Sequence, residues 1–179
     1  ANFGNEGEAP ILKKYTYKTL VPTTEIAIDN TGLFVTPFVL SHVKPYESTA
    51  FLVRNQNSYL LYLGDTGADK VEQSEQLAAL WKTVAPLVMN NQLKGLFIEV
   101  SFDNSVPEKA LFGHLTPNLL MEEMNKLNQL SNLKNTSVYV THLKPCDGCE
   151  VKIKTEIQKA NQISLKISYP LQATLIVLK

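Results

Sequence analysis

Short apolar segments separated by helical patterns constrain the fold of this 179-residue chain most strongly. The segments GLFIEVS (95–101) and SVYVTH (137–142) are almost continuously apolar, which is typical of strands that are buried on both faces of a sheet. Helical periodicity surrounds them, over 71–91, about 117–131 and 151–162. Strands that alternate with helices in this way predict an α/β sheet covered on both faces.

The first half of the chain is richer in strand patterns than the second. It contains three predicted β segments, at about 33–42, 49–55 and 58–64. Weaker β patterning occurs in KYTYKTLV and EIAI, and LKISYP and ATLIVLK close the chain as predicted strands. In the helical segment 71–91, Pro86 is expected to kink the helix or divide it. Together these patterns predict one mixed α/β domain over residues 1–179.

Composition limits the classes of partner. With 44% hydrophobic residues, the chain has enough apolar side chains to bury one core. The 17 basic and 17 acidic side chains cancel, so no net charge attracts nucleic acid or an anionic membrane, and no apolar run is long enough to cross a bilayer. The opening ANFGNEGEAP lacks the pattern of a signal peptide, and the absence of an initiating Met suggests a processed or truncated product.

Cys146 and Cys149 are the only cysteines and form one CxxC motif, KPCDGCE. Two cysteines are too few for a structural zinc site, which needs four ligands. A thioredoxin-like redox site would place the pair after a strand and at a helix start, and this motif partly matches that pattern. We favour a local disulfide or two idle thiols. The spacing favours an oxidising compartment, periplasmic or secreted, over the cytoplasm.

Each of the three histidines lies next to a predicted element. His42 closes the apolar run FVTPFVLSH, His142 ends SVYVTH, and His114 stands in FGHLTP just before a helix. Asp65 follows the strand YLLYL. Because ligand sites of α/β sheets lie at strand ends, these side chains predict a hydrolytic metal site. A half-buried histidine bonded to a backbone carbonyl is the alternative, but the similar surroundings of His42 and His142 favour the metal site.

Asp65 has two other interpretations. In an Asx-turn, its carboxylate would simply cap its own backbone. The phrase Asp-Thr-Gly-Ala-Asp after an apolar strand also resembles the active-site loop of retroviral-type aspartic proteases, in which two aspartates share a proton across a dimer. Those domains are small and almost entirely β. Because a long helix is predicted directly after this loop, the sequence disfavours the protease.

His114 differs from the other two histidines because it precedes a helix start. Thr116 is the predicted capping residue, with Pro117 at the first helical position. Amides at such a start can receive an anion, which suits a histidine that donates a proton to a leaving oxygen beside a phosphate. Glu99, at the end of its strand, is the expected group to orient His114. The alternative for Glu99 is a surface carboxylate that simply ends a buried strand.

In this order, the phrases LSH, STAFLV, LLYLGDTGAD, LFIEVSFDN, LFGHLTP and VYVTHLKP resemble the class II cyclic-nucleotide phosphodiesterases of the metallo-β-lactamase superfamily. The resemblance covers about residues 34–145, and the ordered set is specific although each phrase alone is not. It implies a metallo-β-lactamase-like αββα sandwich. A more distant similarity relates the chain to the tRNA 3′-processing endonucleases of the same superfamily.

The resemblance also implies roles for the site residues. His42 would be a ligand of one Zn²⁺ ion and His142 a ligand of the other, while the Asp65 carboxylate would bridge both. His114 would be the site histidine outside the metal shell, with Glu99 as its partner. The implied chemistry is hydrolysis at a dinuclear zinc centre.

The implied reaction converts cAMP or cGMP to the 5′-nucleotide. Thr116 and Lys144 match the family's phrases, and we assign substrate binding to both. Two alternatives remain open. The first is a tRNA 3′-processing-type endonuclease, against which the chain shows neither net basic charge nor an arginine cluster. The second is an inactive fragment or homologue that serves as a binding module.

One departure from the superfamily concerns its HxHxDH motif, which supplies most metal ligands and is absent here. In the family this motif lies N-terminal to all the phrases above, and ANFGNEGE resembles the segment that follows it. We therefore expect the C-terminal part of an enzyme, inactive and weak in zinc binding by itself, whose partner is the missing N-terminal segment of the same protein. An incomplete sandwich would expose apolar sheet, which favours a homo-oligomer.

Overall fold

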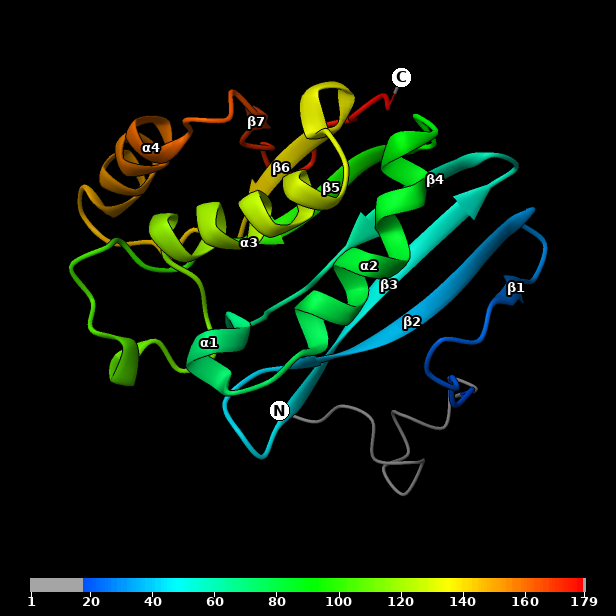
Figure 1. Cartoon of the computed structure of the whole chain (residues 1–179), viewed down its shortest axis with the longest axis horizontal. Coiled ribbons are helices and arrows are strands. Elements are labelled where there is room, and N and C mark those ends of the chain that lie inside the picture. The colour runs from blue at the N-terminus through cyan, green and yellow to red at the C-terminus, as the bar shows by residue number, and fades with distance from the viewer. Residues whose placement is uncertain (1–17, 179) are drawn as a thin grey trace.

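A single seven-stranded sheet organises residues 18–178, which are the residues that the computed structural model describes (Figure 1). Its order is β1-β2-β3-β4-β5-β6-β7, so every strand pairs with its neighbours in sequence. The first four strands pair antiparallel and the last four pair parallel. The strands are β1 (Ile26–Ile28), β2 (Leu33–Ser41), β3 (Glu47–Asn55), β4 (Ser58–Tyr62), β5 (Leu93–Glu99), β6 (Ser137–Thr141) and β7 (Lys166–Ser168).

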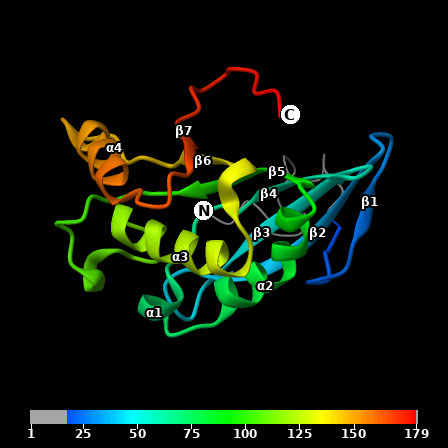
Figure 2. The same cartoon turned by 45° about the horizontal axis from the view of Figure 1, so that its top comes forward.

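Helices form the crossovers between the parallel strands, which tight turns could not join. The chain passes from β4 to β5 through α1 and α2, from β5 to β6 through α3, and from β6 to β7 through α4. Figure 2 shows α1, α2 and α3 on one side of the sheet and the C-terminal segment on the other. The bounds are α1 (Asp69–Glu72), α2 (Gln76–Met89), α3 (Pro117–Leu130) and α4 (Cys149–Ala160).

The core lies between the sheet and these helices. Leu61, Leu96 and Val138 occupy paired positions of β4, β5 and β6 and are fully buried. Trp81 of α2 is fully buried too, and its indole Nε1 donates a hydrogen bond to the buried Glu123 Oε2 of α3 at 2.9 Å. This bond satisfies the one polar group of the indole and fixes α2 beside α3.

Aromatic side chains line the opposite face of the same strands. Tyr62, Phe97 and Tyr139 alternate with the core residues, and Phe97 stacks on Tyr139 with ring centroids 4.5 Å apart. None of the helices of residues 18–178 covers this face, and Tyr62 remains 46% exposed. The sheet is mixed α/β, as predicted, but helices cover one face of it rather than both.

The predicted helix over 71–91 breaks at a different place from the one expected. Pro86 neither ends nor divides α2, which runs through it. The lost hydrogen bond concerns the carbonyl of Lys82, an exposed residue whose oxygen water can reach. The break falls instead at Gln73, whose backbone is left-handed (φ 50°). There the Asp69 carboxylate accepts hydrogen bonds from two amides of α2 and so caps that helix.

Two other strand predictions differ from the structure. ATLIVLK forms no strand over 173–178, where Leu175 is 91% exposed and no strand of residues 18–178 pairs with the segment. The segment KYTYKTLV lies mostly outside the described residues, and its remainder, 18–21, is not a strand. EIAI corresponds to β1 and is confirmed.

Among the helices of residues 18–178, none combines the length and the apolar character that a bilayer crossing requires.

Candidate metal centre

The carboxyl ends of four strands supply the candidate site. His42 directly follows β2, Glu99 ends β5, and His142 directly follows β6. Asp65 lies three residues beyond β4. Since β2, β4, β5 and β6 all run in the same direction, their carboxyl ends meet at one edge of the sheet. Histidine and carboxylate side chains that are far apart in sequence therefore come together at this edge.

Four of the predicted site residues form one cluster. Asp65, Glu99, His114 and His142 each offer a nitrogen or oxygen atom, and these atoms all lie within 4.8 Å of one another. Two imidazoles and two carboxylates are a donor set that suits a divalent metal such as zinc. Of the three predicted metal ligands, Asp65 and His142 belong to this group and His42 does not.

Glu99 and His114 form the buried side of the cluster. Glu99 is only 1% exposed, so it is not a surface carboxylate. The His114 Nδ1–H donates to Glu99 Oε1 at 2.5 Å, and the Ser101 hydroxyl donates to Oε2 at 2.8 Å. The backbone amide of Thr66 lies 3.3 Å from the same carboxylate. Glu99 is thus occupied by donors, and it orients His114 with the Nε2 atom left for other contacts.

Asp65 and His142 form the exposed side. Their side chains are 43% and 46% exposed, and His142 Nδ1 lies 3.2 Å from Asp65 Oδ1. The backbone around Asp65 is fixed, because its carbonyl accepts from the Ser48 hydroxyl and the Gly67 amide donates to Ser41 O at 3.0 Å. Within residues 18–178 the Asp65 carboxylate accepts no backbone amide, so the Asx-turn interpretation is wrong.

His42 lies beside this cluster and outside the four-residue group. Its Nδ1 bonds to the carbonyl oxygen of Gly113 at 2.9 Å, which leaves Nε2 available as a ligand. Gly113 has φ +76°, and a Cβ there would approach His42 Nδ1 to 2.6 Å, so only glycine permits this contact. The His42 ring centroid is 4.9 Å from that of His114, which is 5.2 Å from that of His142. The His114 ring therefore lies next to both of the other imidazoles.

Ser101 is the central residue that sequence reasoning missed. Its hydroxyl lies within hydrogen-bonding distance of Glu99, of His142 Nδ1 at 3.0 Å and of His114 Nδ1 at 3.2 Å. Ser101 is 1% exposed, and its contacts connect the buried side of the cluster with the exposed side. Ser101 stands two residues after Glu99, where the strand ends. Because residues i and i+2 of an extended chain point to the same side, this spacing is the signal that could have identified Ser101.

The two residues assigned to substrate binding have other contacts in the structure. The Thr116 side chain accepts from Leu119 N at 3.4 Å and caps α3, which confirms the predicted helix start. Lys144 Nζ lies 3.9 Å above the Phe102 ring centroid, and that ring packs edge-on against His114. Lys144 therefore lies close to His114, with the Phe102 ring in contact with both.

This mixed sheet with a donor cluster at its strand ends has the metallo-β-lactamase fold. Unliganded yeast PDE1 matches it with a TM-score of 0.76 and 29% identity, over 86% of this chain and 48% of that one. The metallo-β-lactamase fold protein YhfI from Bacillus subtilis matches with a TM-score of 0.59 and 15% identity, over 88% of this chain and 56% of that one. An aspartic protease, nearly all β, is excluded by this fold.

Residues 10–172 match the family model described as cAMP phosphodiesterases class-II, and the chain belongs to this family. It is 37% identical to a 3′,5′-cyclic-nucleotide phosphodiesterase of Aliivibrio fischeri, over 96% of this chain and 54% of that protein. It is 36% identical to a probable 3′,5′-cyclic-nucleotide phosphodiesterase of Yersinia pestis, over 92% of this chain and 50% of that protein. The resemblance noted in the sequence is confirmed, and the chain spans about half the length of these relatives.

Proposed function

We propose that the complete protein containing this chain hydrolyses 3′,5′-cyclic nucleotides, cAMP or cGMP, to 5′-nucleotides at a dinuclear zinc site. The observation that carries the proposal is the convergence of Asp65, Glu99, His114 and His142 at the strand ends of a class-II phosphodiesterase chain. Curated relatives named as cyclic-nucleotide phosphodiesterases support the substrate class.

The residues of this chain fit a metal according to their chemistry and their hydrogen bonds. Asp65 keeps a half-exposed carboxylate that no backbone amide of residues 18–178 occupies. His42 has its Nδ1 bonded to a carbonyl oxygen, which is the usual arrangement of a histidine that binds a metal through Nε2. We therefore assign His42 and His142 as ligands of different ions and Asp65 as the bridge. When bound, two zinc ions would stabilise charge on the phosphoryl oxygens and activate water.

His114 is the proposed proton donor. Opening the cyclic diester to a 5′-phosphate breaks the bond between phosphorus and the 3′ oxygen, which must then gain a proton. His114 is held by Glu99 through Nδ1, so its Nε2 can present a proton at a fixed position. Glu99 does not touch the substrate in this scheme. It positions the imidazole through the hydrogen bond at Nδ1.

Lys144 and Thr116 are the proposed substrate contacts. Lys144 lies over Phe102 beside His114, where a cationic side chain can neutralise a phosphate oxygen. The Thr116 hydroxyl uses an oxygen lone pair to cap α3, so its hydrogen can still be donated to a ligand. The remaining metal ligands are assigned to a segment of the complete protein outside this chain.

Replacing Asp65 by alanine in the complete protein tests the site. Loss of the bridging carboxylate is expected to reduce zinc content and to lower kcat/KM for cAMP by at least about a hundredfold. Metal analysis and a cAMP hydrolysis assay measure the two effects. Asp29→Ala, which removes an exposed carboxylate far from the site in sequence, is the matched control and is expected to leave both unchanged.

Two outcomes would contradict the proposal. If Asp65→Ala keeps its zinc and its turnover, the site assignment is wrong. If the wild-type protein cleaves a tRNA precursor and neither cAMP nor cGMP, the reaction is that of the RNA-processing branch of the superfamily.

A further inference from the structure

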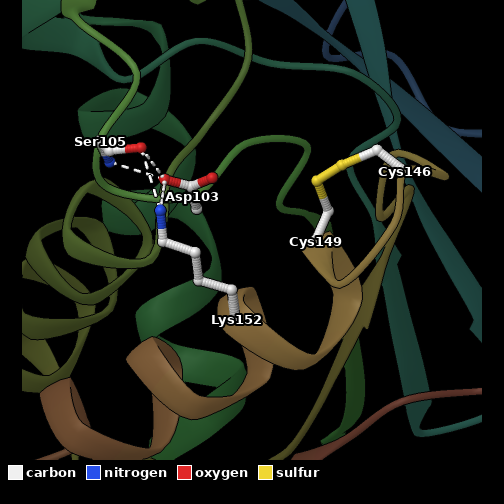
Figure 3. Close-up of a disulfide and its surroundings, with 5 residues drawn as sticks. All are labelled: Asp103, Ser105, Cys146, Cys149 and Lys152. Atoms are coloured by element: carbon white, nitrogen blue, oxygen red, sulfur yellow. Dashed lines mark hydrogen bonds and ion pairs between the residues drawn. A yellow bond between two sulfur atoms is a disulfide. The ribbon is translucent and has the colours of Figure 1, made fainter.

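A disulfide joins Cys146 to Cys149 next to the candidate metal centre, with Cα atoms 5.3 Å apart. Of the two interpretations that the sequence left open, a local disulfide or two idle thiols, the structure shows the disulfide. Cys149 is the first residue of α4, and Cys146 lies four residues after His142 in the segment that joins β6 to α4. Figure 3 shows the bond beside the side chains that attach α4 to the loop after β5.

The position of this disulfide favours easy reduction. Cys146 is exposed, so a soluble thiol can reach its sulfur. Cys149 stands at the start of a 12-residue helix, where the amide dipoles stabilise a thiolate and make it a better leaving group. The loop that the bond closes has only four residues, whereas the stabilisation that a disulfide gives the fold increases with loop length. The bond therefore contributes little to the global fold.

The two ends of the disulfide are anchored to different degrees. On the helix side, α4 is fixed by Ile153 and Ile157 in the core. It is also fixed by Lys152, whose Nζ lies 2.8 Å from the Asp103 carboxylate (Figure 3). On the other side, residues 145–148 are all exposed, and this stretch directly follows Lys144. The covalent bond therefore ties the exposed stretch that follows Lys144 to the anchored helix α4.

We propose that Cys146 and Cys149 form a redox-active pair, and that reduction by a dithiol frees residues 145–148 and lowers the activity of the centre. The effect on activity rests on the proposed function. Lys144 directly precedes the released stretch and His142 lies three residues before it, so its loosening displaces a substrate contact and a ligand together. The oxidised protein is the active form.

Reduction proceeds by thiol–disulfide exchange with an external dithiol. One thiolate of the dithiol attacks the exposed Cys146 sulfur, and the Cys146–Cys149 bond breaks with Cys149 leaving as a thiolate. The second thiolate of the dithiol then displaces Cys146. The protein gains two electrons and two protons, and the dithiol becomes a cyclic disulfide.

Dithiothreitol titration of the complete native protein tests the proposal. Alkylation followed by mass spectrometry of the peptide that contains both cysteines gives the reduced fraction. Cyclic-nucleotide turnover and zinc affinity are measured on the same samples. We expect reduction without denaturant, an unchanged far-UV circular dichroism spectrum and a fall in turnover of at least about fivefold. The double variant Cys146→Ser/Cys149→Ser should match the reduced wild type in every buffer, and it also reports any stripping of zinc by the dithiol.

Several results would overturn the inference. The first is a disulfide that the dithiol reduces only after the protein is denatured. The second is global unfolding on reduction, and the third is a double variant as active as the oxidised protein. A failure of the proposed function is distinguishable from these results. If neither redox state hydrolyses a cyclic nucleotide, the proposed function fails, while a drop in zinc affinity on reduction still supports the redox pair.

Discussion

At the residue scale, Ser101 connects a buried pair of site residues with a half-exposed pair. Glu99 and His114 are buried and hydrogen-bonded to each other, whereas Asp65 and His142 are half exposed. The Ser101 hydroxyl donates to Glu99 and lies 3.0 Å from His142 Nδ1. A single hydroxyl thus sets the orientation of the proposed proton donor and of one proposed ligand. We regard Ser101 as a positioning residue because it supports the groups that would meet metal and substrate.

Ser101→Ala is expected to lower turnover by about tenfold, since groups that support metal ligands carry effects of this order. It should also weaken zinc binding, because His142 loses a partner. Kinetics and a zinc competition assay measure the two effects. Ser58→Ala, which removes an exposed hydroxyl at the start of β4 and so at the opposite end of that strand from the site, is the control and should change neither. Unchanged turnover and zinc affinity in Ser101→Ala would show that the hydroxyl has no positioning role.

At the scale of elements, α4 is attached to the loop after β5 through Asp103. The Asp103 carboxylate accepts from Lys152 Nζ and from the hydroxyl and backbone amide of Ser105. These hydrogen bonds, with that from Lys152 the strongest influence, lower the pKa of Asp103 from 3.8 to about 2. Nearby, Asn104 N donates to Glu156 of the same helix at 2.8 Å. The loop and α4 therefore behave as one unit beside the metal centre.

This lowered pKa predicts a pH dependence of stability. In the unfolded chain the Asp103 carboxyl has a pKa near its usual value, about 3.9. Its contribution is therefore fully present above about pH 4 and is lost as the pH falls from about 4 to about 2. After allowance for the half-exposed Lys152, it is about 1 kcal/mol of the free energy of unfolding.

Urea unfolding between pH 2 and 7 compares the wild type with Asp103→Asn. The difference in the free energy of unfolding should be constant at neutral pH and should disappear near pH 2. Glu150→Gln, which removes an exposed carboxylate paired with Lys154 within α4, is the control and should follow the wild type throughout. A difference that persists at pH 2 would mean that the charge of Asp103 does not stabilise the fold.

Part of the site could be predicted from the sequence alone. Strand ends and residue types were enough to predict the convergence of Asp65, Glu99, His114 and His142, since parallel strands present their carboxyl ends at one edge. The second aspartate of the DTGAD phrase, Asp69, was not recognised as the cap of α2. That role depends on a turn at 73–75, which periodicity does not reveal. Ser101 was missed for a similar reason, because its partners come from three separate segments.

At the scale of the whole molecule, the sheet is covered unequally. Helices bury one face, while Tyr62, Phe97 and Tyr139 form a partly exposed aromatic row on the other. The chain spans about half the length of its curated relatives. In the proposed function, residues of the complete protein outside this chain supply the remaining metal ligands.

Anomalous diffraction at the zinc edge, from crystals of the complete protein, tests the central claim most directly. We predict two zinc peaks at the carboxyl ends of β2, β4, β5 and β6, with the Asp65 carboxylate about 2 Å from both and imidazole nitrogens of His42 and His142 each bound to a different ion. Peaks held elsewhere, or a zinc-loaded protein in which Asp65 contacts neither ion, would contradict it.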